Sequence, residues 1–369
     1  MKLIHTADWQ LGKPFARFDP EVRAALTEAR FDSIDAIGKA ASENGAAHVL
    51  VAGDIFDTDG PSDRTIVQAL SRMQRQPCRW WLLPGNHDYT RSGGLWDRVR
   101  AKGTSNITVV DQALPVEIES GTWLLPAPLV HRHNLEDPTT LFDTMATPNA
   151  VLRIGLAHGS IRGFGSQGET ANQISPDRAR TSSLDYLALG DWHGTLKIDD
   201  RTWYSGTPEA DRFQRDEPGQ ALCVNLEPGL PPQVTPVRTG KFQWMIRDWR
   251  VDDLASFSAQ SRQLLNAVEP AGTLLQLTLT GIAALSDRIA ILLSLEHEIA
   301  HQLRYLDVRA DALVAPPNDD DIAALAIEGM LGDAARKLNA LIEEGGANSA
   351  TAKRALERLF VEVGRGETA

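Results

Sequence analysis

Short apolar runs alternate with amphipathic segments over the first 240 residues of the chain. Early runs typical of buried strands span 2–6, 48–52 and 80–84. Apolar residues at helical spacing predict helices over 21–42 and over 62–74, the second capped by Ser62 or Asp63. Later strands, separated by turns, are expected at 107–110, 116–119, 122–126, 151–158, 186–189, 201–204 and 221–226. This order predicts an α/β protein in which two sheets pack together and helices cover their outer faces.

Two proline-rich breaks divide the rest of the sequence. After Pro231-Pro232 and a turn at 239–241, residues 242–315 alternate three strands with two helices, a pattern that suits a compact unit with its own core. Pro316-Pro317 and three aspartates then precede two amphipathic helices over 319–344 and 349–363. We therefore expect three parts: a first domain at 1–240, a small α/β domain at 241–315 and a helical segment at 316–369.

The two C-terminal helices carry apolar stripes. Their members are Ile322, Leu325, Met330, Leu338 and Leu341, then Leu356, Leu359, Phe360 and Val363. Such stripes usually pack on their own chain, and the alternative is that they dock on a partner protein. The sequence alone leaves both open.

The composition is that of a soluble globular protein. At 369 residues the chain has room for two or three domains and a large core. Two cysteines do not make a disulfide framework, and neither a leader peptide nor a membrane-spanning run is visible, so we expect a cytoplasmic protein. The net charge of −12 argues against non-specific nucleic-acid binding by the whole surface but leaves a local basic groove open.

Five of the strand-like runs end in side chains that can bind metals. In chain order these are Asp8 with Gln10, then Asp54, then Asn86 with His87 and Asp88, then His158, and finally Asp191 with His193. A single carboxylate at a strand end is common, but five such ends in one chain are not. Hydrolysis of a phosphoester needs neutralised charge at phosphorus and a nucleophile at neutral pH, and a pair of metal ions supplies both.

This ordered set resembles the calcineurin-like metallophosphoesterases, whose pattern is D-x-H, G-D, G-N-H-D/E, H and G-H-x-H. The matching segments are Asp8-Trp9-Gln10, Gly53-Asp54, Gly85-Asn86-His87-Asp88, Gly155-Leu156-Ala157-His158-Gly159 and Gly190-Asp191-Trp192-His193. The resemblance implies a four-layer αββα metallophosphoesterase sandwich. Together with the other two parts, we expect that sandwich, a small α/β capping domain and C-terminal helices.

The resemblance also implies which residues bind metal. Asp54 would bridge two divalent ions. The ligands of one ion would be completed by Asp8, Gln10 and His193. Those of the other ion would be completed by Asn86, His158 and Asp191.

Two further residues receive catalytic roles from the same resemblance. His87 would steady the phosphate or protonate the leaving oxygen. Asp88 would hold the His87 ring by accepting a hydrogen bond from it.

Two positions depart from the family pattern. Gln10 stands where a histidine is usual, and Asp191 stands where the first histidine of G-H-x-H is usual. If both act as oxygen donors, the site should favour Mn²⁺, with Mg²⁺ as the second choice, over Zn²⁺. The alternatives are that Gln10 does not ligate, so that one metal binds weakly, or that the site is inactive.

A finer resemblance is to the DNA-repair exonuclease branch, the SbcD-like nuclease subunits. It rests on residues 5–13, on 53–57 with Pro61-Ser62, and on Tyr204-Ser205-Gly206-Thr207-Pro208-Glu209. It implies a metal-dependent DNA exonuclease or endonuclease, a capping domain that contacts DNA, and a C-terminal segment that binds an SMC-like coiled-coil ATPase. Relatives of this kind often form homodimers. The alternatives are a small-molecule phosphodiesterase or phosphatase of the same fold and a non-catalytic scaffold for the ATPase.

Other signals are weaker. His297-Glu298-Ile299-Ala300-His301 matches the H-E-x-x-H zinc motif, but no third ligand follows at a recognised spacing, so we expect a chance match. A P-loop is absent from the sequence, so the chain should not hydrolyse ATP itself.

Overall fold

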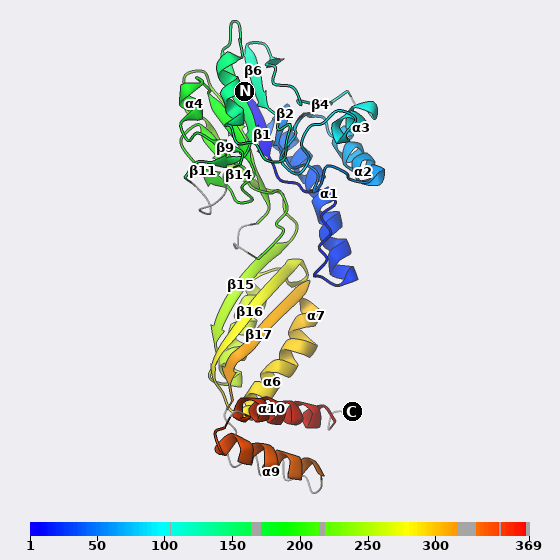
Figure 1. Ribbon diagram of the computed structural model, residues 1–369, viewed down its shortest axis with the longest axis vertical. Coiled ribbons are helices and arrows are strands. Elements are labelled where there is room, and N and C mark those ends of the chain that lie inside the picture. Colours follow the sequence, from blue (N-terminus) through cyan, green and yellow to red (C-terminus); the bar gives the residue numbers. More distant parts are fainter. Residues whose placement is uncertain (104, 164–170, 214–217, 316–329, 347, 367–369) are drawn as a thin grey trace. The chain divides into compact units, whose positions relative to one another are not determined.

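The computed structural model describes the whole chain except residues 104, 164–170, 214–217, 316–329, 347 and 367–369, and for 330–331, 357 and 360–366 it describes only the backbone. The chain divides into two compact units (Figure 1). One comprises Met1–Arg212 with Glu217–Gln243, and the other comprises Phe213–Asp216 with Trp244–Ala369. Each is described by itself.

The first unit contains two six-stranded sheets. The first sheet has the order β14-β13-β1-β2-β3-β4, in which β1 to β4 run parallel. Its strands are β1 (Lys2–Thr6), β2 (His48–Ala52), β3 (Arg79–Leu83), β4 (Ile107–Val109), β13 (Gln220–Asn225) and β14 (Gln233–Arg238). The second sheet has the order β11-β12-β10-β7-β6-β5, with β6, β7, β10 and β12 parallel. Its strands are β5 (Val116–Glu119), β6 (Thr122–Ala127), β7 (Leu152–His158), β10 (Tyr186–Gly190), β11 (Leu196–Lys197) and β12 (Thr202–Tyr204).

Side-chain alternation explains how the sheets pack. In β1, Leu3 belongs to the core between the two sheets, where it joins Ile154 and Ala188 of the second sheet. Its neighbour Ile4 belongs to the core on the opposite face, beneath the helices. Successive strand residues point to opposite faces, so a fully buried run such as β2 fills both cores at once.

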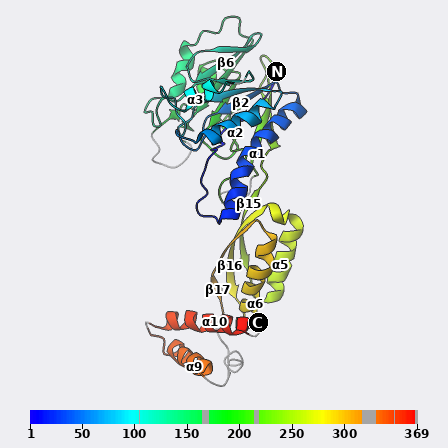
Figure 2. The same cartoon turned by 90° about the vertical axis from the view of Figure 1, so that its right-hand side faces the viewer.

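Helices cover the outer face of the first sheet. They are α1 (Pro20–Asn44), α2 (Asp63–Gln74) and α3 (Leu95–Ala101), and Figure 2 shows α2 crossing in front of β2. The Ser62 hydroxyl caps α2 by accepting the Thr65 N–H at 3.2 Å. Gly45, at φ 67°, ends α1 in the left-handed conformation.

The outer face of the second sheet is covered by the 3₁₀ helix Pro138–Thr144 and the short α4 (Arg178–Thr181). A small parallel pair, β8 (Ser160–Ile161) with β9 (Gln173–Ile174), extends the loop after β7. The order helix, sheet, sheet, helix confirms the expected sandwich.

The second unit is a three-stranded sheet with helices on one face. The sheet has the order β15-β16-β17, with strands Gln243–Arg250, Thr273–Ile282 and Tyr305–Val314. The helices α5 (Leu254–Ala267) and α6 (Leu285–Ser294) lie side by side, and α6 continues through a π-helical turn at Leu295–Ile299 into α7 (Ala300–Gln302). Phe257 and Ile291 pack on Leu275, Leu277 and Leu279 of β16 in a core separate from those of the first unit.

Two further helices belong to this unit, α9 (Met330–Glu343) and α10 (Ser349–Gly366). They pack on each other around Ala335 and Leu356, with Leu338, Ile342 and Leu359 at the edge of the contact. The described part of both stripes thus faces the neighbouring helix, while Leu341 remains 39% exposed. Ile322 and Leu325, and the side chains of Met330, Phe360 and Val363, lie outside the described residues. Among the described helices, none has the length and apolar character needed to cross a membrane.

Candidate active site

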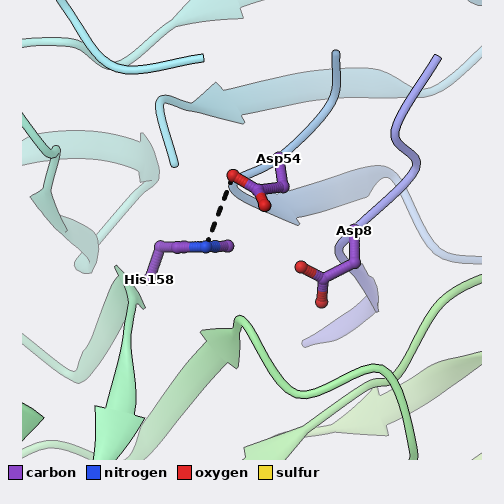
Figure 3. A group of neighbouring side chains, drawn as sticks. All are labelled: Asp8, Asp54 and His158. Carbon is purple, nitrogen blue, oxygen red and sulfur yellow. Dashed lines mark ion pairs between the residues drawn. The ribbon is translucent and has the colours of Figure 1, made fainter. Parts of the chain in front are cut away.

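The proposed metal ligands follow the carboxyl ends of parallel strands in both sheets. Asp8 follows β1, Asp54 follows β2, and His158 is the last residue of β7. Figure 3 shows these three side chains pointing toward one another. One donor atom from each of the three side chains lies within 4.8 Å of the other two. Among the described residues, this cluster of acidic and histidine side chains could hold a metal ion. Convergence at strand ends is the usual way in which α/β folds build a site.

The backbone at the ligand positions is unusual. Asp8, Gln10 and Asp54 have φ values of 56°, 44° and 53°, and Asp191 has a φ of 103°. Residues other than glycine rarely adopt positive φ, and such strain gathers at functional sites. The loops support each other, because the Asp8 N–H donates to the carbonyl of Gly53 at 3.1 Å and the Gln10 N–H to that of Asp54 at 2.9 Å.

His158 lies at the centre of the donor cluster. Its Nδ1 is 2.8 Å from the carbonyl of Ala52, which can only accept a hydrogen bond, so Nδ1 carries a hydrogen and Nε2 faces the cluster. Nε2 lies 3.4 Å from Asp54 Oδ1 and 3.8 Å from Asp191 Oδ1. The amide oxygen of Asn86 lies 3.2 Å from the same nitrogen. Four of the expected ligands of one ion therefore meet.

The electrostatics of this cluster favour a positive charge. Burial disfavours the charged form of His158, but the carboxylates of Asp54, Asp8 and Asp191 outweigh burial and raise the pKa of the ring to about 9. Burial also raises the pKa of Asp8 to about 6. The donors are mainly carboxylate and amide oxygens around a single imidazole, so the set fits a divalent cation of the harder kind.

Glycines let the donors approach one another. A Cβ atom on Gly53, which has a φ of 88°, would lie 2.3 Å from His158 Nδ1. A Cβ atom on Gly85 would lie 2.3 Å from Asp54 Oδ1. Both positions exclude any larger residue, which explains the glycine in G-D and in G-N-H-D.

The remaining two proposed ligands, Gln10 and His193, lie beside each other. Gln10 Nε2 is 3.3 Å from His193 Nε2, and Gln10 Oε1 accepts a hydrogen bond of 2.9 Å from the ammonium of Lys13. His193 Nδ1 lies 3.3 Å from a carboxylate oxygen of Asp211. The Gln10 oxygen thus faces a lysine, an arrangement that the sequence did not predict.

His87 occupies the position expected of a residue that acts on the substrate. Its backbone N–H donates to Asp54 Oδ1 at 2.9 Å, and its Nε2 lies 3.9 Å from Asp54 Oδ2. The side chain is 30% exposed, whereas that of Asp54 is 4% exposed. His87 can therefore reach both the ligand cluster and solvent.

The expected contact between Asp88 and the His87 ring is wrong. The ring Nδ1 lies 2.9 Å from the carbonyl of Asp57 instead. The Asp88 carboxylate turns inward and accepts the backbone N–H groups of Gly85, Ile55 and Phe56 at 2.7, 2.8 and 3.0 Å. Burial, followed by the nearby charge of Asp54, raises the pKa of Asp88 to about 7 despite these bonds. Asp88 positions the loops that carry Asp54 and His87.

Several supporting residues were missed by sequence reasoning. Asp211 is buried and lies within ion-pair distance of Lys13, Arg30 and His193. Burial alone would raise its pKa, but His193, Arg30 and Lys13 outweigh that effect and hold the pKa well below the usual range. Asp211 sits five residues beyond Gly206, in a stretch whose only sequence signal was the resemblance of residues 204–209.

Glu209 is a second buried carboxylate of the same segment. It accepts the N–H groups of Lys241 and Phe242 at 2.6 and 3.1 Å, at the end of the first unit. Burial raises its pKa to about 7. The Thr207 hydroxyl lies 2.9 Å from the carbonyl of Asp8, so this segment also supports the first ligand loop.

The H-E-x-x-H segment belongs to no such cluster. It begins within the π-helical turn, and His297, Glu298 and His301 are exposed. Glu298 accepts a hydrogen bond from the Ser294 hydroxyl at 2.8 Å. The segment does not join a metal-binding group in the described part of the chain.

Comparison with known proteins supports the pattern. A sequence model of the family described as Calcineurin-like phosphoesterase matches residues 1–223. A curated relative is the Uncharacterized metallophosphoesterase YhaO of Bacillus subtilis (strain 168), 24% identical over 207 residues that cover 52% of this chain and 48% of the relative. The match thus spans about half the length of that protein. A solved crystal structure aligns with 62% of this chain and 98% of its own at 11% identity, with a TM-score of 0.38.

Proposed function

Because the chain belongs to the calcineurin-like phosphoesterase family, we propose that it is a metal-dependent phosphodiesterase that cleaves DNA. The observation that carries the hydrolytic part is the position of His87 next to Asp54. A partly exposed imidazole stands 3.9 Å from a carboxylate of a buried donor cluster. That geometry suits a group that contacts a phosphate oxygen while the cluster holds the cation.

The residues divide the work of hydrolysis between them. Asp8, Asp54, Asn86, His158 and Asp191 would hold a divalent ion, which when bound neutralises phosphate charge and supplies an activated water. His87 donates a proton to the leaving oxygen, and its orientation is fixed by its contact with the carbonyl of Asp57. The buried Asp88 holds the loops of Asp54 and His87 together through its three backbone hydrogen bonds.

The composition of the donor set supports Mn²⁺ as the preferred ion. Asp191 replaces an imidazole of the family pattern with a carboxylate, and a more oxygen-rich site favours manganese or magnesium over zinc. Magnesium would support less activity because it demands near-ideal octahedral geometry and loses water reluctantly.

Two features support DNA over a small substrate. The segments 5–13, 53–57 and 204–209 resemble those of the SbcD-like nuclease subunits. The chain also carries a second unit with its own core, for which hydrolysis of a small molecule has no evident need. A phosphodiesterase or phosphatase for small molecules uses the same donor cluster and is the second candidate.

We also propose that the C-terminal helices dock on a coiled-coil ATPase of the SMC-like class. The support is the resemblance and the exposure of Leu341 on α9. The other described apolar residues of the two stripes pack between α9 and α10. Removal of residues 319–369 should abolish association with such a partner and leave cleavage of a small phosphodiester intact. Undiminished recovery of the partner with the shortened chain would rule out this docking role.

The decisive experiment offers metal-free protein two substrates. End-labelled linear DNA and bis(p-nitrophenyl) phosphate are incubated with Mn²⁺, Mg²⁺ or Zn²⁺, and Asp54→Asn serves as the inactive control. Manganese-dependent cleavage of both substrates supports the nuclease. Cleavage of the small ester alone favours the small-molecule enzyme. Failure to cleave either substrate with any of the ions favours a scaffold without catalysis.

A further inference from the structure

A closed ring of polar contacts surrounds Gln10 and His193, on the side of the site away from His158. The ammonium of Lys13 donates to Gln10 Oε1, and Gln10 Nε2 faces His193 Nε2 at 3.3 Å. His193 Nδ1 in turn faces Asp211 at 3.3 Å, and Asp211 pairs with the same Lys13. We call these four side chains the Lys13 ring. It closes on itself through a lysine that belongs to no part of the metal-binding pattern.

The chemistry of the donors fixes the direction of each contact in the ring. An ammonium group has hydrogens to donate and no lone pair, so the end of the Gln10 amide that faces Lys13 must be the oxygen. The NH₂ end therefore faces His193 and donates to the lone pair of Nε2. His193 then carries its hydrogen on Nδ1, toward the Asp211 carboxylate. The contacts of Lys13 with Gln10 and Asp211 and of Gln10 with His193 are hydrogen bonds, whereas His193 Nδ1 and Asp211 lie at ion-pair distance without hydrogen-bond geometry.

This assignment makes the ring a poor site for a metal. The single Nε2 lone pair of His193 accepts from the Gln10 amide, and the Gln10 oxygen accepts from the positively charged Lys13 ammonium, which repels a cation at its remaining lone pair. In the neighbouring cluster the oxygens of Asp54, Asn86 and Asp191 face His158 Nε2, and the carboxylates keep lone pairs beyond those that accept hydrogen bonds. The residues of the family's second metal position therefore do not fit an ion here.

We propose that this protein binds a single divalent ion at the Asp8, Asp54 and His158 cluster, and that the Lys13 ammonium supplies the second positive charge of the site. The proposal rests on the metal-dependent function given above. The ammonium is anchored from two sides, by Gln10 and by Asp211, and the lysine side chain is still 26% exposed. It can therefore meet a substrate oxygen while it holds Gln10.

The buried surroundings keep the ring in place. Gln10 is 4% exposed, and the side chain of Asp211 is 2% exposed and also lies 3.4 Å from the guanidinium of Arg30. An ionised carboxylate that is buried between two cations needs both of them. The ion pair with Asp211 therefore fixes the position of the Lys13 ammonium. In that position the ammonium also donates its hydrogen bond to Gln10.

The test counts bound ions directly. Metal-free wild-type protein and three variants are titrated with Mn²⁺ by calorimetry, and the bound metal is then measured by elemental analysis after gel filtration. The variants are Lys13→Met, the double change Lys13→Met with Gln10→His, and the matched control Lys39→Met. Lys39 lies on α1, and its side chain is 74% exposed.

Wild type and Lys39→Met should each bind one ion. Lys13→Met should gain a weak second ion, because the Gln10 amide can then turn its oxygen toward that ion, and the double variant should bind two ions. Two ions on the wild type would overturn the proposal while leaving the metal-dependent function intact. One ion on the double variant would also overturn it, because the Lys13 ring would not be what excludes the second ion. Absence of bound metal from the wild type would count against the proposed function itself.

Discussion

The two halves of the site are built from one sequence pattern and differ in what their donor atoms face. On the Asp54 side, three oxygens face one imidazole nitrogen, and the carboxylates of Asp54, Asp8 and Asp191 outweigh burial and raise the pKa of His158. On the Gln10 side, each acceptor already has a hydrogen from a neighbouring side chain. The difference arises from Lys13 and Asp211, which lie outside the metal-binding pattern. A motif therefore specifies which donors are present, while their neighbours decide whether those donors are free.

The largest effect is expected from breaking the Asp54 side. Asp54→Asn should abolish turnover and remove most of the bound metal, because an amide has one oxygen where the carboxylate has two. Phosphodiester cleavage and metal content are measured on the same sample. The control is Asp200→Asn, whose side chain is 75% exposed. Near-normal cleavage by Asp54→Asn would refute the assignment of the metal site.

The next effect separates chemistry from metal binding. His87→Ala should lower kcat by about 10²–10⁴-fold, the usual contribution of a general acid, and should leave the metal content unchanged. The control is His133→Ala, at an exposed loop position. Loss of the metal from His87→Ala would make His87 a ligand and remove its proposed role.

Glu209 lies in the same segment as Asp211 of the Lys13 ring. It therefore tests this side of the site through stability rather than activity. Its folded-state pKa of about 7 lies above the usual value of 4.5, so the folded protein holds this proton more tightly than the unfolded chain does. The associated stability is therefore present below pH 4.5 and is lost as pH rises to about 7, a change of about 3 kcal/mol.

The comparison uses Glu209→Gln, which cannot ionise. From pH 4.5 to 8, its free energy of unfolding should rise relative to wild type by that amount, as measured by urea denaturation at each pH. Glu43→Gln is the control because its side chain is 62% exposed. A difference that stays constant with pH would show that Glu209 keeps an ordinary pKa in the fold.

The smallest effect concerns Asp88. Asp88→Asn should lower the free energy of unfolding by about 1–3 kcal/mol, because one of the three backbone N–H groups it now binds would face the amide NH₂. Turnover should fall much less than in His87→Ala. Urea denaturation and kinetics measure both quantities, again against Asp200→Asn. A kinetic loss as large as that of His87→Ala would restore a direct catalytic role for Asp88.

Sequence reasoning located most of the strands because buried strands are continuous apolar runs. The runs 2–6 and 48–52 were predicted at the bounds of β1 and β2, and the third run was placed one residue late. The strand β14 was missed because it lies at a sheet edge, contains Pro236 and is largely exposed. The helix α3 was missed because it has seven residues and its N-cap residue, Gly94, has no side chain to cap it.

The sequence predicted which side chains lie at the strand ends of the site, but not the contacts that those side chains make. Asp8, Asp54 and His158 converge as their strand ends implied. The Lys13 ring depends on a contact between residues 198 positions apart, which no local pattern contains. Asp88 was assigned to its sequence neighbour His87, but the fold turns its carboxylate to the backbone of residues 55 and 56. Motif spacing identifies residues, and tertiary contacts assign their orientation.

The positive φ values at Asp8, Asp54 and Asp191 have an evolutionary consequence. A backbone that is strained in order to aim a carboxylate is relieved by glycine, and by asparagine in the left-handed region. Selection for thermal stability alone would therefore drive these positions toward glycine or asparagine and inactivate the protein. Copies of this fold that have lost catalysis should carry those residues here and should melt at higher temperature than their active relatives.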